Sequence, residues 1–259
     1  MSKLNYIKHE VKNWLKERRV RSQNIDDEYK SIFHALDTDG YAILENYWDK
    51  DQCAQALKEA DAALSEYEDH CWKDDKGADQ RLYGAERVFP SGEQFWKDPF
   101  LQSIAETYAE LKPVKGFTML NRILFKEENN GSGGGWHRDT ATVRQFKAII
   151  YLSDVTQESG PFEFLPGSHT TRSLVWTEFK LGLKEHQNRF SEEEIAKALN
   201  ALNLEKVQVI GKRGTLLLVD TRGIHRGAPL SSGQRYAMTN YYLPEVGAHF
   251  KKLMFDKDA

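Results

Sequence analysis

The sequence has few cysteines and no long hydrophobic run, and each shortage excludes a class of protein. Only two of its 259 residues are cysteine, Cys53 and Cys71. They cannot build a disulfide framework, and neither belongs to a metal-binding cysteine pair. No apolar stretch approaches the length of a membrane span, and the charged N-terminus lacks the apolar core of a signal peptide. We therefore expect a cytoplasmic protein with no membrane partner.

The sequence also lacks a strong excess of either charge. Its formal net charge is −3, so it offers no basic field for nucleic acid or anionic membranes. A hydrophobic share of 40% and a charged share of 29% are typical of an ordinary globular protein. Internal repeats, low-complexity tracts and linkers are absent as well. We expect a single domain that spans residues 1–259.

The first 112 residues are expected to form a mainly helical layer. Apolar side chains recur there at three- and four-residue spacing, the pattern of helices that bury one face. Asp49 or Asp51 can cap one helix, and Asp98-Pro99 opens another. The expected helices run from Leu4 to Trp14, from about Asp27 to Leu36, from Asp49 or Asp51 to Leu64, and from Asp98 to Tyr108.

A short strand and a long polar stretch interrupt this layer. Tyr41–Leu44 follows the turn signal Asp39-Gly40 and is typical of a strand. From Trp72 to Gln94 the sequence becomes polar and rich in turn-forming residues, so we expect an irregular loop. A loop of this length is often a lid or a binding loop. A surface loop without a functional role is the alternative.

After Pro113 the pattern changes from helices to strands. Ser191 and Glu194 form a capping box in front of the one helix expected there. We therefore predict an α+β fold. It is a double-stranded β-helix, or cupin-like jelly roll, at 113–245, with a helical insert at 174–204 and an N-terminal helical layer at 1–112. The expected strands are 117–125, 143–152, 161–165, 207–210, 215–219 and 235–243.

A glycine-rich stretch, Gly131–Asp139, carries the chemistry. It delivers His137 and Asp139 two residues apart, and only this one of the eight histidines has an aspartate at that spacing. On an extended backbone such residues project to the same face, so both can reach one metal ion. His225 is the best candidate for a third ligand, since strand ends meet at the mouth of a jelly roll. Two histidines and a carboxylate form the facial triad of non-haem Fe(II) oxygenases.

With these residues the chain resembles the phytanoyl-CoA dioxygenase family of Fe(II)- and 2-oxoglutarate-dependent oxygenases. The likeness rests on His137-Arg138-Asp139, on His225, and on Arg235 ten residues later. The segment Ser159-Gly160-Pro161, followed by Leu165-Pro166-Gly167-Ser168-His169, adds a recurrent family pattern. The resemblance runs from about Asp39 to Leu243. It leaves out the N-terminus and the insert from Leu174 to Asn203.

The resemblance implies a reaction and its cofactors. His137, Asp139 and His225 would hold Fe(II), and O₂ and 2-oxoglutarate would be cosubstrates. The reaction would convert 2-oxoglutarate to succinate and CO₂ while an aliphatic carbon of a small molecule is hydroxylated. Related halogenases have a small residue at the position of Asp139, so its carboxylate favours hydroxylation or desaturation.

Three further residues are candidates for binding the cosubstrate. Arg235 would meet the distal carboxylate of 2-oxoglutarate, because a guanidinium fork pairs with a carboxylate and keeps its charge when desolvated. An edge-strand arginine in a surface ion pair is the alternative. Asn121 would present its amide to the cosubstrate or, equally, join a network within the barrel. Thr142 is a weaker candidate contact.

The remaining polar residues leave the substrate open. His169, after a Pro-Gly-Ser turn, is expected to be structural rather than a ligand. If several arginines face the mouth of the barrel, they favour an anionic substrate such as a carboxylate or a phosphate ester; solvated surface arginines are the alternative. These arginines are Arg81, Arg87, Arg122 and Arg144.

Two other classes of function compete with an oxygenase. One is a metal-binding cupin-like isomerase or hydrolase without oxygen chemistry, and Arg235 argues against it, because only the oxygenase needs a partner for a distal carboxylate. The other is a non-catalytic binding protein on a relic barrel. Intact His137, Asp139, His225 and Arg235 argue against that, because a relic has no reason to keep the cost of buried charge.

Overall fold

The computed structural model describes residues 27–141, 143–184 and 187–255. Two features named from the sequence, the helix from Leu4 to Trp14 and the candidate Thr142, lie outside the described residues. Within the described ranges, no helix has the length and apolarity needed to cross a membrane.

Antiparallel strands make up two sheets, and helices flank them. The helices are α2 (Asp27–Thr38), α3 (Lys50–Glu66), α4 (Pro90–Trp96), α5 (Pro99–Tyr108), α6 (Thr171–Leu181), α7 (Glu192–Leu202) and α8 (Ala248–Leu253), with short 3₁₀ turns η1 (Glu68–His70) and η2 (Ala85–Arg87). The strands are β1 (Tyr41–Leu44), β2 (Trp72–Lys73), β3 (Asp79–Tyr83), β4 (Lys115–Leu124), β5 (Phe146–Tyr151), β6 (Phe162–Phe164), β7 (Val207–Val209), β8 (Leu216–Asp220), β9 (His225–Gly227) and β10 (Gln234–Leu243).

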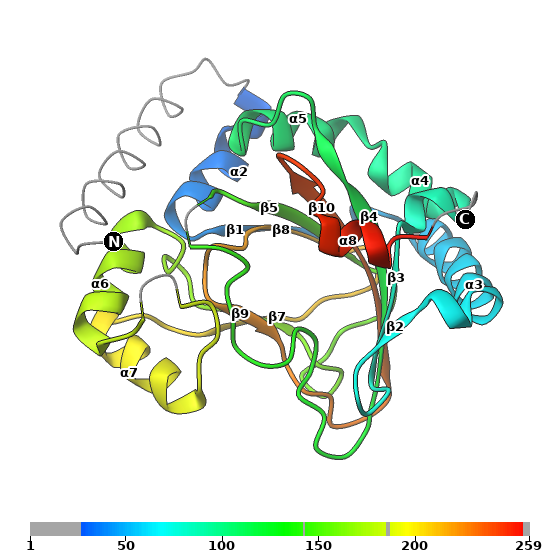
Figure 1. Cartoon of the computed structure of the whole chain (residues 1–259). Helices are drawn as coiled ribbons and strands as arrows, with labels where there is room; N and C mark the ends of the chain where they lie inside the picture. Colours follow the sequence, from blue (N-terminus) through cyan, green and yellow to red (C-terminus); the bar gives the residue numbers. More distant parts are fainter. Residues whose placement is uncertain (1–26, 142, 185–186, 256–259) are drawn as a thin grey trace.

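The larger sheet has seven strands in the order β1-β8-β5-β10-β4-β3-β2, and the smaller sheet has three in the order β7-β6-β9. Side chains from both sheets share one apolar cluster, which includes Tyr151, Leu217 and Ala237 from the large sheet and Phe162 and Val209 from the small one. The two sheets therefore face each other. This arrangement confirms the predicted α+β class, with a jelly-roll barrel covered by helices (Figure 1).

The two-residue period of the central strands separates core from cavity. In β5, Phe146, Ala148 and Ile150 join the apolar core under the helices, whereas Lys147, Ile149 and Tyr151 line a cavity between the sheets. The neighbouring strand β10 follows the same rule, since successive side chains point to opposite faces. Its even-numbered Tyr236, Met238 and Tyr242 are in the core; its odd-numbered Arg235, Ala237, Thr239 and Tyr241 line the cavity.

Local capping signals in the sequence correspond to observed helix starts. Asp49 caps α3 through a capping box with Gln52, and Ser191 caps α7 through one with Glu194. Asp98 accepts hydrogen bonds from the backbone at the start of α5, where proline occupies the first turn. These predictions are confirmed because each depends on residues adjacent in sequence.

The prediction of an irregular loop from Trp72 to Gln94 is wrong. That stretch contains β2, β3 and η2, and α4 begins within it at Pro90. Strand β3 forms by pairing with β4, where Arg81 lies opposite Asn121. The polar composition of this stretch hid strand β3, whose Arg81 and Tyr83 line the cavity.

Other boundaries also differ from the expected ones. The strand expected from residue 143 begins only at Phe146. Helix α6, which was not expected, begins at Thr171, just before the predicted insert 174–204, and α8 was not expected either. Strand β9, which begins at His225, is too short to show a period in sequence. It forms by pairing with β6, where His225 lies opposite Phe164.

Candidate metal and cosubstrate site

The glycine-rich stretch and β9 are joined directly by backbone hydrogen bonds. The amide of His137 donates to the carbonyl of His225 at 2.9 Å, and the amide of His225 donates to the carbonyl of His137 at 2.8 Å. This reciprocal pair places the two histidines side by side although 88 residues separate them in the sequence (225 − 137). Asp139 is anchored in the same way, since its amide donates to the carbonyl of Thr221 at 3.0 Å.

Gly133 shows why the loop before His137 is rich in glycine. Its φ is +87°, a region that L side chains rarely adopt, and a Cβ placed there would overlap the ring of His137. The loop can therefore pass close to the imidazole only because this position lacks a side chain.

The three predicted ligands converge. His137, Asp139 and His225 each offer a ligand atom, and these atoms lie within 4.8 Å of one another. Nε2 of His137 is 3.9 Å from Oδ1 of Asp139, and the two imidazole rings are 4.3 Å apart between centroids. Such spacing suits a single ion bound between them, because metal–nitrogen and metal–oxygen bonds are about 2 Å long.

Backbone carbonyls set the tautomer of both histidines. Nδ1 of His137 lies 2.9 Å from the carbonyl oxygen of Gly135, and Nδ1 of His225 lies 2.8 Å from that of Gly223. Because a carbonyl can only accept, Nδ1 carries the proton in each ring and Nε2 keeps its lone pair. Metal-binding histidines are commonly oriented in this way.

Burial keeps these imidazoles neutral. Together with the neighbouring His225, burial lowers the pKa of His137 to about 3, and burial lowers the pKa of His225 as well. Both rings are therefore neutral at pH 7, which is the form that binds metal. For Asp139, burial alone raises the pKa, but the neighbouring Lys147 ammonium and the two histidines together outweigh it and hold the pKa well below its usual range.

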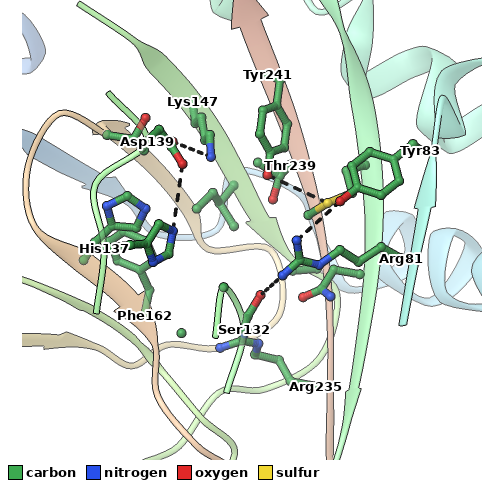
Figure 2. Close-up of a pocket in the computed structure, with 18 of the residues that line it drawn as sticks. Arg81, Tyr83, Ser132, His137, Asp139, Lys147, Phe162, Arg235, Thr239 and Tyr241 are labelled. Atoms are coloured by element: carbon green, nitrogen blue, oxygen red, sulfur yellow. Dashed lines mark hydrogen bonds and ion pairs between the residues drawn. The ribbon is translucent and has the colours of Figure 1, made fainter. Parts of the chain in front are cut away.

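Lys147 is a site residue that was not predicted. Its side chain is 6% exposed, and its Nζ lies 2.6 Å from Oδ2 of Asp139. Figure 2 shows it beside Asp139, with its ammonium directed at that carboxylate. The signal in the sequence was a single lysine inside an otherwise apolar strand, Phe146–Tyr151. A lysine at a strand position is common on a surface, so the signal was not specific.

Arg235 points into the cavity and carries an unpaired charge. It is 5% exposed, and its buried Nε and Nη1 have no hydrogen-bond partner among the described residues. Burial lowers its pKa, yet an arginine remains charged even so. The alternative of a surface ion pair is therefore wrong. A buried guanidinium without a partner indicates a missing anion.

Asn121 belongs to a network around Asp79. Its amide nitrogen donates to Oδ1 of Asp79 at 2.6 Å and lies 3.3 Å from the carbonyl oxygen of Gln80. Arg81 pairs with the same carboxylate, with Nη2 2.5 Å from Oδ2. Asn121 lines the cavity, but its donors are used within the barrel. These contacts favour the network over a role in binding the cosubstrate.

Of the four arginines named from the sequence, only Arg81 lines the cavity. Arg87 pairs with Glu86 at 3.3 Å, Arg122 donates to Gln80, and Arg144 donates to the carbonyl of Tyr108. The condition that several of them face the mouth is therefore not met. His169 is buried beside Gly40 and is not part of the triad, as predicted.

The cavity has a volume of about 240 Å³, below the roughly 300–1,000 Å³ of typical ligand pockets. The exposed lining residues Arg189 and His249 mark its mouth. Aromatic side chains that were not predicted form a wall of the cavity, above Arg81 and Arg235 in Figure 2. They include Tyr83 from β3 and Tyr241 from β10, and Phe250 from α8 lies against both rings.

The donor set fits an octahedral Fe(II) centre. Two neutral imidazoles and one carboxylate leave open positions for a chelating cosubstrate and O₂. Arg235 lies in the same cavity and offers the cation that the far end of a dicarboxylate needs. The residues present therefore suit both an iron ion and 2-oxoglutarate.

Comparisons with known proteins agree with this site. A family model described as phytanoyl-CoA dioxygenase (PhyH) matches residues 36–237. A search of curated proteins finds no match.

Several solved structures share the fold. EctD from S. alaskensis with bound Fe is 21% identical, with a TM-score of 0.67 over 85% of this chain and 79% of that one. The epimerase SnoN in complex with Fe³⁺, alpha-ketoglutarate and nogalamycin RO is 19% identical, with a TM-score of 0.63 over 83% of each chain. HygX from Streptomyces hygroscopicus, with nickel, 2-oxoglutarate and hygromycin B, is 14% identical, with a TM-score of 0.58 over 83% of this chain and 87% of that one.

Proposed function

The chain belongs to the phytanoyl-CoA dioxygenase family, whose members use Fe(II), 2-oxoglutarate and O₂, and we propose that it hydroxylates an aliphatic carbon of a small molecule. His137, Asp139 and His225 are the proposed iron ligands, and Arg235 is the proposed partner of the distal carboxylate of 2-oxoglutarate. When bound, iron and its cosubstrates supply the oxidation that converts 2-oxoglutarate to succinate and CO₂ and transfers one oxygen atom to a carbon.

One observation carries this proposal: Arg235, whose buried Nε and Nη1 have no hydrogen-bond partner in the described part of the chain, shares a cavity with a convergent His-Asp-His triad. A buried charge without a partner is costly, and a dicarboxylate that reaches from the metal to Arg235 removes that cost. A cupin-like isomerase or hydrolase without oxygen chemistry has no use for this guanidinium. The oxygenase is therefore the better explanation.

The protein residues position the cosubstrate and exclude water. The guanidinium fork of Arg235 can pair with both oxygens of a carboxylate, which sets the orientation of the cosubstrate. Tyr151 and Phe162 line the same cavity and limit access of water. The hydroxyl of Tyr151 is fixed by donating to the carbonyl of Val209 at 2.9 Å.

The carboxylate of Asp139 supports hydroxylation over halogenation. In related halogenases, a small residue at this place leaves room for a halide at the metal. Here Asp139 occupies that place, and its Oδ1 is 3.9 Å from Nε2 of His137. An oxygen atom, rather than a halogen, is the group we expect to be transferred.

The charges that line the cavity favour an anionic substrate. Four cations line it, Arg81, Lys147, Arg189 and Arg235. Two carboxylates, Asp79 and Asp139, pair with Arg81 and Lys147. A divalent metal would add two positive charges, and the dianion 2-oxoglutarate would cancel only those two. The remaining positive field suits a small carboxylate or phosphate ester.

A turnover assay tests the proposal. The protein with Fe(II) is incubated with 2-oxoglutarate and O₂, with and without a library of anionic and neutral metabolites, and succinate is measured. We expect substrate-stimulated succinate formation that His137→Ala abolishes, and a product heavier by one oxygen atom. A product of unchanged mass would instead indicate epimerisation, and a product lighter by two hydrogens would indicate desaturation or ring closure. Failure to consume 2-oxoglutarate under all conditions would contradict the oxygenase itself.

A further inference from the structure

The two oxygens of the Asp139 carboxylate have different neighbours. Oδ1 lies 3.9 Å from Nε2 of His137, on the side of the triad, whereas Oδ2 lies 2.6 Å from Nζ of Lys147. In the close-up, dashed lines join Asp139 both to the His137 imidazole and to the Lys147 ammonium (Figure 2). Lys147 therefore forms its ion pair with the oxygen that does not face His137.

This division matters for a metal that must also bind a chelating cosubstrate. An octahedral ion held by a facial triad has three positions left, and 2-oxoglutarate and O₂ need all three. A carboxylate that bound through both oxygens would take one of these positions. An ammonium that forms an ion pair with Oδ2 keeps the carboxylate to a single metal bond.

Lys147 is itself held in place by the neighbouring strand, β10. It is the register partner of Tyr241 in the pairing of β5 with β10, and its ammonium lies 4.0 Å from the centre of the Tyr241 ring. Such a contact between a cation and an aromatic face is attractive. The Tyr241 ring stacks on Phe117 with centroids 4.8 Å apart and contacts Phe250 at 5.8 Å.

We propose that Lys147 is a positioning residue that holds Oδ2 of Asp139 and so restricts this carboxylate to one metal bond, keeping a coordination position open for the cosubstrate. The inference rests on the proposed function, because it takes Asp139 to be a ligand. It goes further by assigning a role to a buried lysine that the reaction chemistry itself does not require. It also connects the metal site, through Tyr241, to the aromatic wall of the cavity.

The test uses Co(II) in place of iron, because its visible absorption reports the number and geometry of its ligands without turnover. Lys147→Met removes the charge and keeps a side chain of similar length. We expect its Co(II) spectrum to differ from that of the wild type and its binding of 2-oxoglutarate to the Co(II) protein to weaken. With Fe(II), succinate formation should fall roughly 10–100-fold, as for loss of a group that orients a metal ligand. Lys147→Arg, which keeps the charge, should recover part of the wild-type spectrum.

Lys197→Met is the matched control, because Lys197 pairs with Glu193 on the exposed surface of α7. It should leave the spectrum and 2-oxoglutarate binding unchanged. A Lys147→Met protein that loses thermal stability but keeps the wild-type Co(II) spectrum and 2-oxoglutarate affinity would overturn the proposal, since Lys147 would then only support packing. A wild-type protein that binds no Co(II) would contradict the proposed function instead, so the two failures can be distinguished.

Discussion

At the scale of single residues, a buried polar group without a partner is the most informative feature. Most buried polar groups have partners, as Asn121 does in its contact with Asp79. Arg235 is different, because its Nε and Nη1 are buried without a partner among the described residues. Within the described ranges, these two atoms of the buried Arg235 guanidinium form no hydrogen bond that would stabilise the ligand-free protein. Binding of a ligand best explains why the guanidinium is there.

Arg235→Leu tests this explanation directly. Loss of one member of a buried charge pair costs about 2–5 kcal/mol, so the affinity for 2-oxoglutarate should fall roughly 30-fold or more. The midpoint of thermal unfolding without ligand should not fall, because the side chain lost has no hydrogen-bond partner to leave behind. Calorimetric titration of the Co(II) protein and a thermal melt measure the two quantities.

Arg213→Leu is the control for that variant, since Arg213 is a surface arginine paired with Asp154 at 3.5 Å. It should bind 2-oxoglutarate like the wild type. If Arg235→Leu also bound the cosubstrate normally, the distal carboxylate would have to be held elsewhere, for example by Arg81.

At the scale of elements, the cavity is built by strands with a two-residue period and by the C-terminal helix. Strands β5 and β10 direct alternate side chains into the core and the cavity. Helix α8 then adds Phe250, whose ring lies 5.0 Å from Phe117 and 6.1 Å from Tyr83. This helix lies beyond residue 237, where the family match ends. The wall it completes therefore lies partly outside the matched residues, and we expect it to contact the substrate.

Phe250→Ala should change substrate binding and spare the cosubstrate. An aromatic contact of this kind is worth about 0.5–1.5 kcal/mol beyond the buried area, so KM for the substrate should rise roughly two- to tenfold. Affinity for 2-oxoglutarate should stay the same, because Tyr241 keeps its stacking contact with Phe117. Lys252→Ala, on an exposed position of α8, should change neither value. An equal loss of both affinities would show that α8 supports the whole site instead.

At the scale of the whole molecule, the site depends on the closure of one sheet over the other. His137 and His225 meet through reciprocal backbone hydrogen bonds, and Arg235 reaches the same cavity from β10 of the large sheet. None of these side chains converges in an unfolded chain. A ligand that needs all of them therefore binds the folded state alone and stabilises it.

The corresponding prediction concerns ligand-linked stability. Co(II) and 2-oxoglutarate are added together, each at about 100 times its dissociation constant. Each ligand should then stabilise the wild type by about 2.7 kcal/mol, and the midpoint of thermal unfolding should rise. His137→Ala should show little of this rise. His34→Ala, which removes a histidine from the exposed face of α2, should keep it. A rise of equal size in His137→Ala would mean that the metal binds elsewhere.

Several features could be predicted because they depend on neighbours in the sequence. Asp49 and Ser191 cap helices through residues three positions away, and the His137-Arg138-Asp139 spacing sets two candidate ligands on one face. Lys147, Tyr83 and Phe250 were missed as site residues because a lysine or an aromatic residue in a strand or helix has no local mark of its function. Strand β3 was missed because its partner, β4, supplies the reason for it to be a strand.

The sequence alone therefore determined the class of fold, the starts of α3, α5 and α7 and the identity of the candidate ligands, since hydrophobic period, capping and motif spacing are local properties. Tertiary structure alone decided that Arg235 lies buried without a partner, that Asn121 bonds to Asp79, and that Lys147 holds one oxygen of Asp139. The physical reason is that burial and pairing are set by which distant strands become neighbours, and only the closed barrel brings those strands together.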